Sequence, residues 1–319
     1  MRTDVFHEGE IAVQARAGER AIAVRNGAML RATITGGALP FLAQQRTVAI
    51  ALQAADGRLW ASLWFGHAGF FRSPDGQTVT ITRDVQCIGN DDPVWTHLRR
   101  GSQLGLLAIE LGSRRRLRIN GVVSTITGDV VTIEVREVFP NCPKYIQRRQ
   151  LQEAQEANPA TNQGLRRSHA NGAAIDDERR ALIEATDTLF VASQHVVRGV
   201  DVSHRGGASG FVRVLDEHTL RIPDYPGNSM FQTLGNFEID GRASVVITDF
   251  RRGRLLSITG SARLRFGPED PQQPTAGTGR YWELAVERWI EHAMPARYRW
   301  QLLDASPFNP PPFAGAGTP

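Results

Sequence analysis

The densest group of polar residues and glycines in the chain lies at residues 201–211. Ser203 supplies a hydroxyl there, and the planar guanidinium of Arg205 matches the geometry of a phosphate. The adjacent Gly206 and Gly207 permit close approach of the backbone and let successive amides point at an anion. The pattern predicts an anion site. The simpler alternative is a glycine-rich hairpin turn with a solvated arginine.

A second group of short polar side chains follows at residues 222–236. Pro226 and Gly227 predict a tight turn at its start. Tyr225 and Phe231 lie among amides and hydroxyls, and this combination suits a planar heterocycle that carries a phosphate. The polar residues concerned are Asn228, Gln232, Thr233 and Asn236. Ordinary turn chemistry is the alternative, because Asn and Gly are common turn formers.

The third candidate is the run 141–145, in which Cys142 is followed by Lys144 and Tyr145. A thiol beside a lysine can be activated as a nucleophile. No histidine and no second cysteine are near it in the sequence, so a structural role or a place beside a cofactor is the favoured interpretation. We expect Lys144 and Tyr145 to contact a ligand where two halves of the molecule meet.

Other chemistries lack their motifs. The sequence has no CxxC or HExxH pattern and its eight histidines are scattered, so no metal site is predicted. It has no Walker loop and no GxSxG elbow. The glycines at 206–210 are not a dinucleotide fingerprint, because the next segment, 211–215, is predicted to be a strand and not a helix.

Composition narrows the class of protein further. The 319 residues are 41% hydrophobic and 22% charged, as in a globular protein long enough for two domains. The net charge of +4 is mild and the arginines fall in short clusters, so nucleic acid is not an expected partner. No membrane span or secretory signal is predicted. Cys87 and Cys142 form no disulfide framework, and we expect a cytoplasmic protein.

The elements that must position these residues occur twice. Residues 62–72 match residues 203–213 at an offset of 141, and 104–121 resembles 243–260 with the offset slipped by two. Each copy contains short apolar or alternating segments separated by turn residues, which predicts antiparallel barrels and not a parallel sheet. The predicted fold class is therefore mainly β, with two similar barrels in tandem.

Few helices are expected. The predicted ones are 93–99, 176–185 and 280–293. In the last of these, Trp282, Val286 and Trp289 would share one face and pack in the core. Residues 150–174 are predicted to begin as a helix and continue as a flexible linker. The predicted divisions are an N-terminal extension at 1–38, a first split-barrel repeat at 39–149, a linker at 150–175, a second repeat at 176–305 and a Pro/Gly-rich tail at 306–319.

Together the motifs resemble the pyridoxamine 5'-phosphate oxidase-like FMN-binding split-barrel family, in its tandem two-repeat form. The segments that carry the resemblance are 203–207, 222–225, 227–228, 231–236 and, at the end of the first half, 139–146. In that family a six-stranded split barrel pairs with another barrel, and FMN lies between them. The resemblance implies that the two repeats form a pseudo-dimer within one chain.

The resemblance also implies a cofactor site. Ser203 and Arg205 would hold the FMN phosphate, and Thr233 and Asn236 would assist them. The backbone near Gly210 and Phe211 would line the ring. The other cofactor-binding residues expected are His204, Gly206, Pro223, Tyr225, Asn228, Phe231 and Lys144. In the first repeat Trp64 stands where the second has its arginine, so that repeat would instead supply the opposite wall through Arg114, Arg116, Asn120 and Lys144.

The function implied is that of an FMN-dependent oxidoreductase acting on a small-molecule substrate or electron donor, with a reduced nicotinamide cofactor as one candidate. No residue is assigned as a catalytic acid or base, because the chemistry would belong mostly to the cofactor. Two alternatives stay open. One is a haem-handling or deazaflavin-binding split barrel, which His204 would favour, and the other is a flavin-binding protein without turnover. A homodimer is an option for the assembly.

Overall fold

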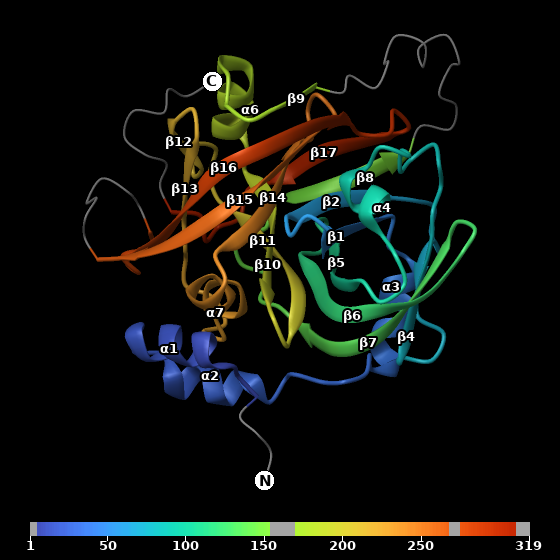
Figure 1. Ribbon diagram of the computed structural model, residues 1–319, viewed down its shortest axis with the longest axis horizontal. Coiled ribbons are helices and arrows are strands. Elements are labelled where there is room, and N and C mark those ends of the chain that lie inside the picture. Colours follow the sequence, from blue (N-terminus) through green and yellow to red (C-terminus); the bar gives the residue numbers. More distant parts are fainter. Residues whose placement is uncertain (1–4, 154–169, 268–274, 311–319) are drawn as a thin grey trace.

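The computed structural model describes residues 5–153, 170–267 and 275–310, and these form mainly strands (Figure 1). Two large antiparallel sheets have the strand orders β2-β1-β5-β6-β7-β4-β3 and β11-β10-β14-β15-β16-β13-β12, with β9 pairing to β16. The second order repeats the first, strand for strand. The predicted fold class, two split β-barrels in tandem, is therefore confirmed.

The first sheet consists of β1 (Thr47–Gln53), β2 (Leu59–Phe65), β3 (Phe71–Arg72), β4 (Thr78–Thr82), β5 (Gln103–Glu110), β6 (Arg115–Thr127) and β7 (Val130–Pro140). The second consists of β9 (Ala170–Gly172), β10 (Thr188–His195), β11 (Gly199–Gly206), β12 (Arg213–Asp216), β13 (Thr219–Pro223), β14 (Arg242–Asp249), β15 (Arg254–Phe266) and β16 (Arg280–Ala293). A small separate sheet pairs β8 (Arg148–Glu153) with β17 (Tyr298–Asp304). The helices are α1 (Glu8–Arg16), α2 (Arg20–Gly27), α3 (Leu39–Ala43), α4 (Pro93–His97), α6 (Asp177–Ala185) and α7 (Gln232–Ile239), with a 3-10 turn at Gly36–Ala38.

The first strand of each repeat is buried on both faces. Val48 and Ile50 of β1 pack in the core of the first repeat, whereas Ala49 and Ala51 belong to a cluster that both repeats share. Phe190 of β10 lies in the same shared cluster. Because side chains alternate along a strand, one continuous apolar run serves both an internal core and the contact between the barrels.

Hydrogen bonds between the repeats follow a pseudo-twofold pattern. Arg118 of β6 donates from Nε to the Val202 carbonyl at 2.8 Å. At the corresponding place, Ser257 of β15 donates from Oγ to the Ala61 carbonyl at 2.9 Å. Ala61 and Val202 are equivalent residues of β2 and β11, so the two repeats form the predicted pseudo-dimer within the chain.

Two of the three predicted helices are present. The carboxylate of Asp92 caps α4 by accepting from the amides of Val94 and Trp95, and Asp176 caps α6 by accepting from the Arg179 amide. The helices α1, α2, α3 and α7 were not predicted. Of residues 150–174, the part at 150–153 lies in β8 and is not the start of a helix, and 154–169 fall outside the described residues.

The prediction of a helix at 280–293 is wrong, because this segment is strand β16. Trp282, Leu284 and Val286 are buried in the alternation of a strand, and Ala285 between them is exposed. A β-bulge opposite Thr259 and Gly260 then shifts the register, after which Trp289 is buried. Buried residues alternate along the strand on both sides of the bulge, and the extra residue at the bulge made the spacing of Trp282, Val286 and Trp289 look helical.

Among the described residues, no helix combines the length and the apolar character needed to cross a bilayer.

The bulge gives Gly260 a steric role that can be measured. A Cβ at Gly260 would lie 1.9 Å from the Ala285 carbonyl oxygen, whereas a Cβ at Gly36 meets nothing within 4 Å. We expect Gly260→Ala to lower the free energy of unfolding by at least about 2 kcal/mol, and Gly36→Ala to change it by less than about 1 kcal/mol. Urea unfolding of both variants measures the difference. Equal stabilities would show that the strand tolerates a side chain at the bulge.

Candidate functional site

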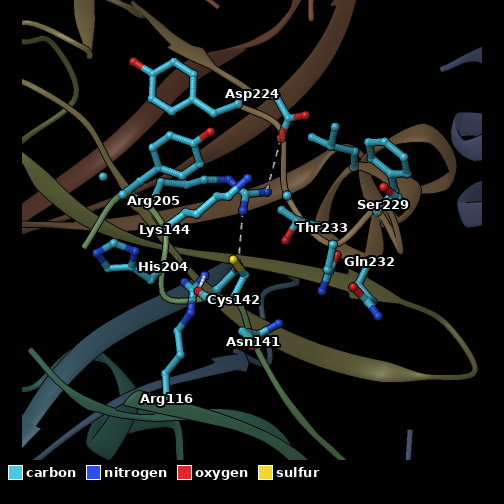
Figure 2. Close-up of a pocket in the computed structure, with 18 of the residues that line it drawn as sticks. Arg116, Asn141, Cys142, Lys144, His204, Arg205, Asp224, Ser229, Gln232 and Thr233 are labelled. Atoms are coloured by element: carbon cyan, nitrogen blue, oxygen red, sulfur yellow. Dashed lines mark hydrogen bonds and ion pairs between the residues drawn. The ribbon is translucent and has the colours of Figure 1, made fainter. Parts of the chain in front are cut away.

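A cavity lies where the two repeats meet, and both contribute to its wall (Figure 2). β6 and the segment 141–145 form one side, and β11, the segment 223–231 and the start of α7 form the other. The wall contains all but two of the predicted cofactor residues: Ser203, His204, Arg205, Gly206, Phe211, Pro223, Tyr225, Asn228, Phe231, Thr233 and Lys144.

The two exceptions are Gly210 and Asn236, which are not among the wall residues. The Asn236 amide donates to Ser193 Oγ at 2.9 Å, and its carbonyl oxygen lies 3.0 Å from His7 Nε2. Asn236 therefore stabilises the packing around α7 and is not positioned to assist a phosphate.

The close backbone approach predicted for the first motif is present at Gly206, and the segment that approaches belongs to the first repeat. β11 runs through Gly206, and a Cβ there would lie 2.1 Å from the Tyr145 carbonyl oxygen. Glycine thus lets the segment from the first repeat pass close to the strand. The Gly207 amide donates to the Asp187 carbonyl at 3.2 Å, so the expectation that both amides point at an anion is wrong for Gly207.

Positive charge gathers on the cavity wall, which includes Arg116, Arg118, Lys144 and Arg205. Arg205 comes from the second repeat, as its motif predicted; it lies 3.7 Å from Asp224 and donates to Ser203 Oγ at 3.3 Å. Asp224 also pairs with Arg280 at 3.1 Å, so its carboxylate is shared between two arginines. The charge of Arg205 is only partly balanced within the protein.

The arginines of β6 face Arg205 from the first repeat. Arg118 is buried and pairs with Asp201 at 2.9 Å. Arg116 donates to the Cys142 carbonyl and forms no ion pair within the described parts of the chain. The two side chains are two residues apart on one strand, so they point to the same face. The prediction of the opposite wall omitted Arg118. Its spacing from Arg116, which is visible in the sequence, could have identified it as a wall residue.

The other residues predicted for the opposite wall divide into two groups. Lys144 and Arg116 line the cavity as expected. Arg114 instead pairs with Asp304 and donates to the Ile146 carbonyl at 2.8 Å, and Asn120 donates to Asp201 at 3.2 Å. Arg114 and Asn120 therefore hold the structure around the cavity without lining it.

The local electrostatics disfavour any additional positive charge. Burial, together with the charges of Arg118 and Arg205, lowers the pKa of Arg116 to about 9. Burial, and then nearby arginines, lowers the pKa of His204 well below its usual value, so its imidazole is neutral at pH 7. Burial also lowers the pKa of Arg205, although Asp224 opposes this effect. A bound anion would relieve all three shifts.

Several buried nitrogens on the wall lack a hydrogen-bond partner among the described residues. They are Arg116 Nε, His204 Nε2, Arg205 Nε and Gln232 Nε2. An unsatisfied buried donor costs about 1–3 kcal/mol. Such a set of nitrogens fits a ligand rich in acceptor oxygens, and a phosphate offers acceptors on every side.

Aromatic rings and strained backbone lie next to these cations. The rings of Tyr145 and Tyr225 are 4.9 Å apart, and the Tyr145 hydroxyl donates to the Pro226 carbonyl at 3.2 Å. Tyr145, Ser229 and Phe231 all have positive φ angles, near +60°. Residues held in this region cluster at ligand sites, where the surrounding structure stabilises them.

The pseudo-symmetric counterpart of this cavity is filled. Ser62 and Trp64 correspond to Ser203 and Arg205, and both donate to the carboxylate of Asp92, the residue that caps α4. Trp64 is 1% exposed. The places that Arg116 and Arg118 occupy are taken by Leu255 and Ser257. This second place has neither the space nor the charge for an anion.

The N-terminal helices hold the loop in front of α7 in place. Gln14 donates to the Met230 carbonyl at 2.9 Å, and Asn26 donates to the Asn228 carbonyl at 2.7 Å. Glu19 accepts from the Ser229 hydroxyl. In Figure 1 both helices are drawn in blue, and α1 lies directly against α7. The described part of the predicted N-terminal extension, residues 5–38, therefore positions part of the cavity wall.

Comparison with known proteins gives structural matches of low identity. No family model matches the sequence, and no curated protein matches it. The solved structures that match include HupZ from Group A Streptococcus, with 18% identity, a TM-score of 0.31 and coverage of 38% of this chain and 98% of that chain. A FAD-binding protein from Mesorhizobium loti has 11% identity, a TM-score of 0.28 and coverage of 40% and 99%. A protein of the pyridoxinephosphate oxidase family from Clostridium acetobutylicum has 10% identity, a TM-score of 0.27 and coverage of 40% and 97%. The split-barrel architecture is defined by the duplicated strand order and not by these matches.

The N-terminal contact predicts a pH dependence of stability. Glu10 is buried against Gly235, and burial raises the pKa of its carboxyl group to about 8. Between pH 6.5 and 8 the folded state therefore retains a proton that the unfolded state has lost, so stability falls as the pH rises. We expect Glu10→Gln to remove this loss, amounting to at most about 1.4 kcal/mol per pH unit.

Urea unfolding of both proteins at pH 6.5 and pH 8 measures the effect. The glutamine oxygen can still accept from the His7 amide, as Glu10 does at 2.8 Å, so the cap is conserved. The same pH dependence in both proteins would show that Glu10 does not titrate in this range.

Proposed function

We propose that this protein binds one FMN per chain in the cavity between its repeats and acts as an FMN-dependent oxidoreductase. The observation that carries the proposal is the set of arginines from both repeats that face one buried space with unsatisfied nitrogens. A dianionic phosphate supplies the charge and the acceptors that this set lacks. The duplicated split barrel and the motif resemblance support a flavin as the molecule to which this phosphate belongs.

The residues present fit such a cofactor. Arg205 and Ser203 of β11, with Arg116 and Arg118 of β6, would hold the phosphate, and Thr233 at the start of α7 would add a hydroxyl. The enclosed volume of about 90 Å³ is below the roughly 300–1,000 Å³ of pockets that surround a whole ligand. The cavity would therefore enclose the phosphate, while the rest of the cofactor extends towards the opening.

The aromatic and neutral groups suit the remainder of the cofactor. Tyr145, Tyr225 and Phe231 provide apolar surface for a planar ring, and the neutral imidazole of His204 can donate or accept a hydrogen bond without adding charge. Bound FMN supplies hydride or electron transfer at its ring. The protein's own contribution is to bind the phosphate with positive charge and to orient the ring against the aromatic side chains. The reaction partner is a small molecule.

Loss of the central arginine should weaken the phosphate contact. We expect Arg205→Ala to reduce the affinity for FMN by about 10- to 100-fold, because a charge-assisted hydrogen bond contributes about 1.5–3 kcal/mol. Arg205→Lys keeps the charge but loses the planar guanidinium, so its affinity for FMN should lie between those of the unchanged protein and Arg205→Ala. Quenching of flavin fluorescence on titration gives the affinities.

Arg251→Ala is the matched control, since Arg251 is exposed and does not line the cavity. Equal affinities of the Arg205→Ala and Arg251→Ala variants would remove Arg205 from the phosphate site.

The filled counterpart predicts the stoichiometry. Because Trp64 and Asp92 occupy the corresponding place, we expect saturation at about one FMN per chain, measured by absorbance after gel filtration of the loaded protein. The same spectrum separates a flavin from a haem, the alternative that an unpartnered His204 Nε2 supports. Two equivalents of FMN would contradict the proposed asymmetry, and a haem spectrum would contradict the choice of cofactor.

A further inference from the structure

A second cavity lies beside the first and shares two of its wall residues. Arg116 and Asn141 line both cavities. Residues of the segment between β7 and β8 line both cavities: Cys142 and Lys144 line the first, and Pro143 lines the second. Among the described residues, the two cavities share no other wall residue.

The second cavity is large enough for an organic molecule. Its volume of about 640 Å³ falls in the range of roughly 300–1,000 Å³ for small-molecule sites. Its outer wall is the chain between α2 and α3, which is tied to β7 by two hydrogen bonds between the backbones of Arg31 and Val138, at 3.0 and 2.8 Å. This tie fixes the wall relative to the first cavity.

The chemistry of the wall is apolar with positive charge. Apolar surface comes from Met29, Phe41, Leu117, Val138 and Phe139. The cations are Arg31, Arg114, Arg115 and Arg116, of which Arg114 is paired with Asp304. The guanidinium of Arg115 lies 4.8 Å from the centre of the Phe41 ring. Within the described parts of the chain, no Asp or Glu lines this cavity. Arg115 carries no ion pair to a described residue, so its charge is available to a ligand.

We propose that the second cavity binds a small, mainly apolar carboxylate at the same time as the first cavity holds its phosphate ligand. The apolar wall would take the body of the molecule, and Arg115 would pair with its carboxylate at the rim. The shared Arg116 and Asn141 place this molecule next to the proposed cofactor, as a reactant requires. Only the identity of the neighbouring ligand rests on the proposed function, because the volume and charge of the second cavity stand by themselves.

The test uses 2-naphthoate as a probe and 2-naphthalenemethanol as its uncharged analogue, titrated into the full chain with and without riboflavin 5'-phosphate. We expect 2-naphthoate to bind in both cases without displacing the flavin. Arg115→Gln and Thr35→Glu should each weaken 2-naphthoate binding by at least about fivefold, since one removes a cation and the other adds an anion at the rim. Binding of 2-naphthalenemethanol should change less than twofold, as a rough limit for a ligand without charge.

Arg100→Gln is the matched control, because Arg100 is an exposed arginine outside both cavities. Equal 2-naphthoate affinities of the Arg115→Gln and Arg100→Gln variants would overturn the proposal, and so would competition between 2-naphthoate and riboflavin 5'-phosphate. If the protein binds no flavin, the titration of the flavin-free protein still decides the matter. A loss of 2-naphthoate affinity in Arg115→Gln would then support the second cavity while the proposed function fails.

Discussion

Like charges that face one another in a protein interior repel, and water screens that repulsion poorly there. Arg116 and Arg118 on β6 meet Arg205 on β11 under this constraint, and Asp201 and Asp224 offset it only in part. Burial is the main cause of the lowered pKa values of Arg116 and Arg205, and the neighbouring arginines add to it, while Asp224 opposes it at Arg205. The packing of two barrels holds these strands together, so the stability of the fold sustains an arrangement that an anion would stabilise further.

The duplicated fold contains this group of facing arginines in one of its two equivalent places and not in the other. The two repeats share a strand order, and equivalent hydrogen bonds cross between them at Val202 and Ala61. At the positions that line the cavity the repeats differ. In one place the side chains leave a cationic cavity, and in the other the indole of Trp64 and the carboxylate of Asp92 satisfy each other. One internal place thus keeps a cavity with unbalanced positive charge, while its counterpart is closed by hydrogen bonds within the protein.

Much of this arrangement was readable in the sequence because duplication and strand alternation are local patterns. The repeats, the strands around Ser203 and Arg205, and the substitution by Trp64 all followed from residue spacing. The identity of β16 did not, because the bulge beside Gly260 changes the phase of burial and only the paired strand reveals it. The role of Gly206 depends on where the Tyr145 carbonyl passes.

The role of the N-terminal helices was equally hidden, since Gln14 and Met230 are distant in sequence and share no motif. The same limit applies to Arg118. Its strand phase with Arg116 is visible in the sequence, but its approach to the second repeat depends on how the two barrels pack. Sequence patterns thus predicted most of the strands and most of the wall, but not the helices α1, α2, α3 and α7. Contacts between the repeats decided which residues meet.

The most direct test compares riboflavin with riboflavin 5'-phosphate, two ligands that differ only in the group that the arginines would bind. Their dissociation constants can be measured by fluorescence quenching at the same low ionic strength. The account predicts that the phosphate ester binds at least about 100-fold more tightly, consistent with two or more charge-assisted contacts of about 1.5–3 kcal/mol each. Equal affinities, or no binding of either ligand, would contradict it.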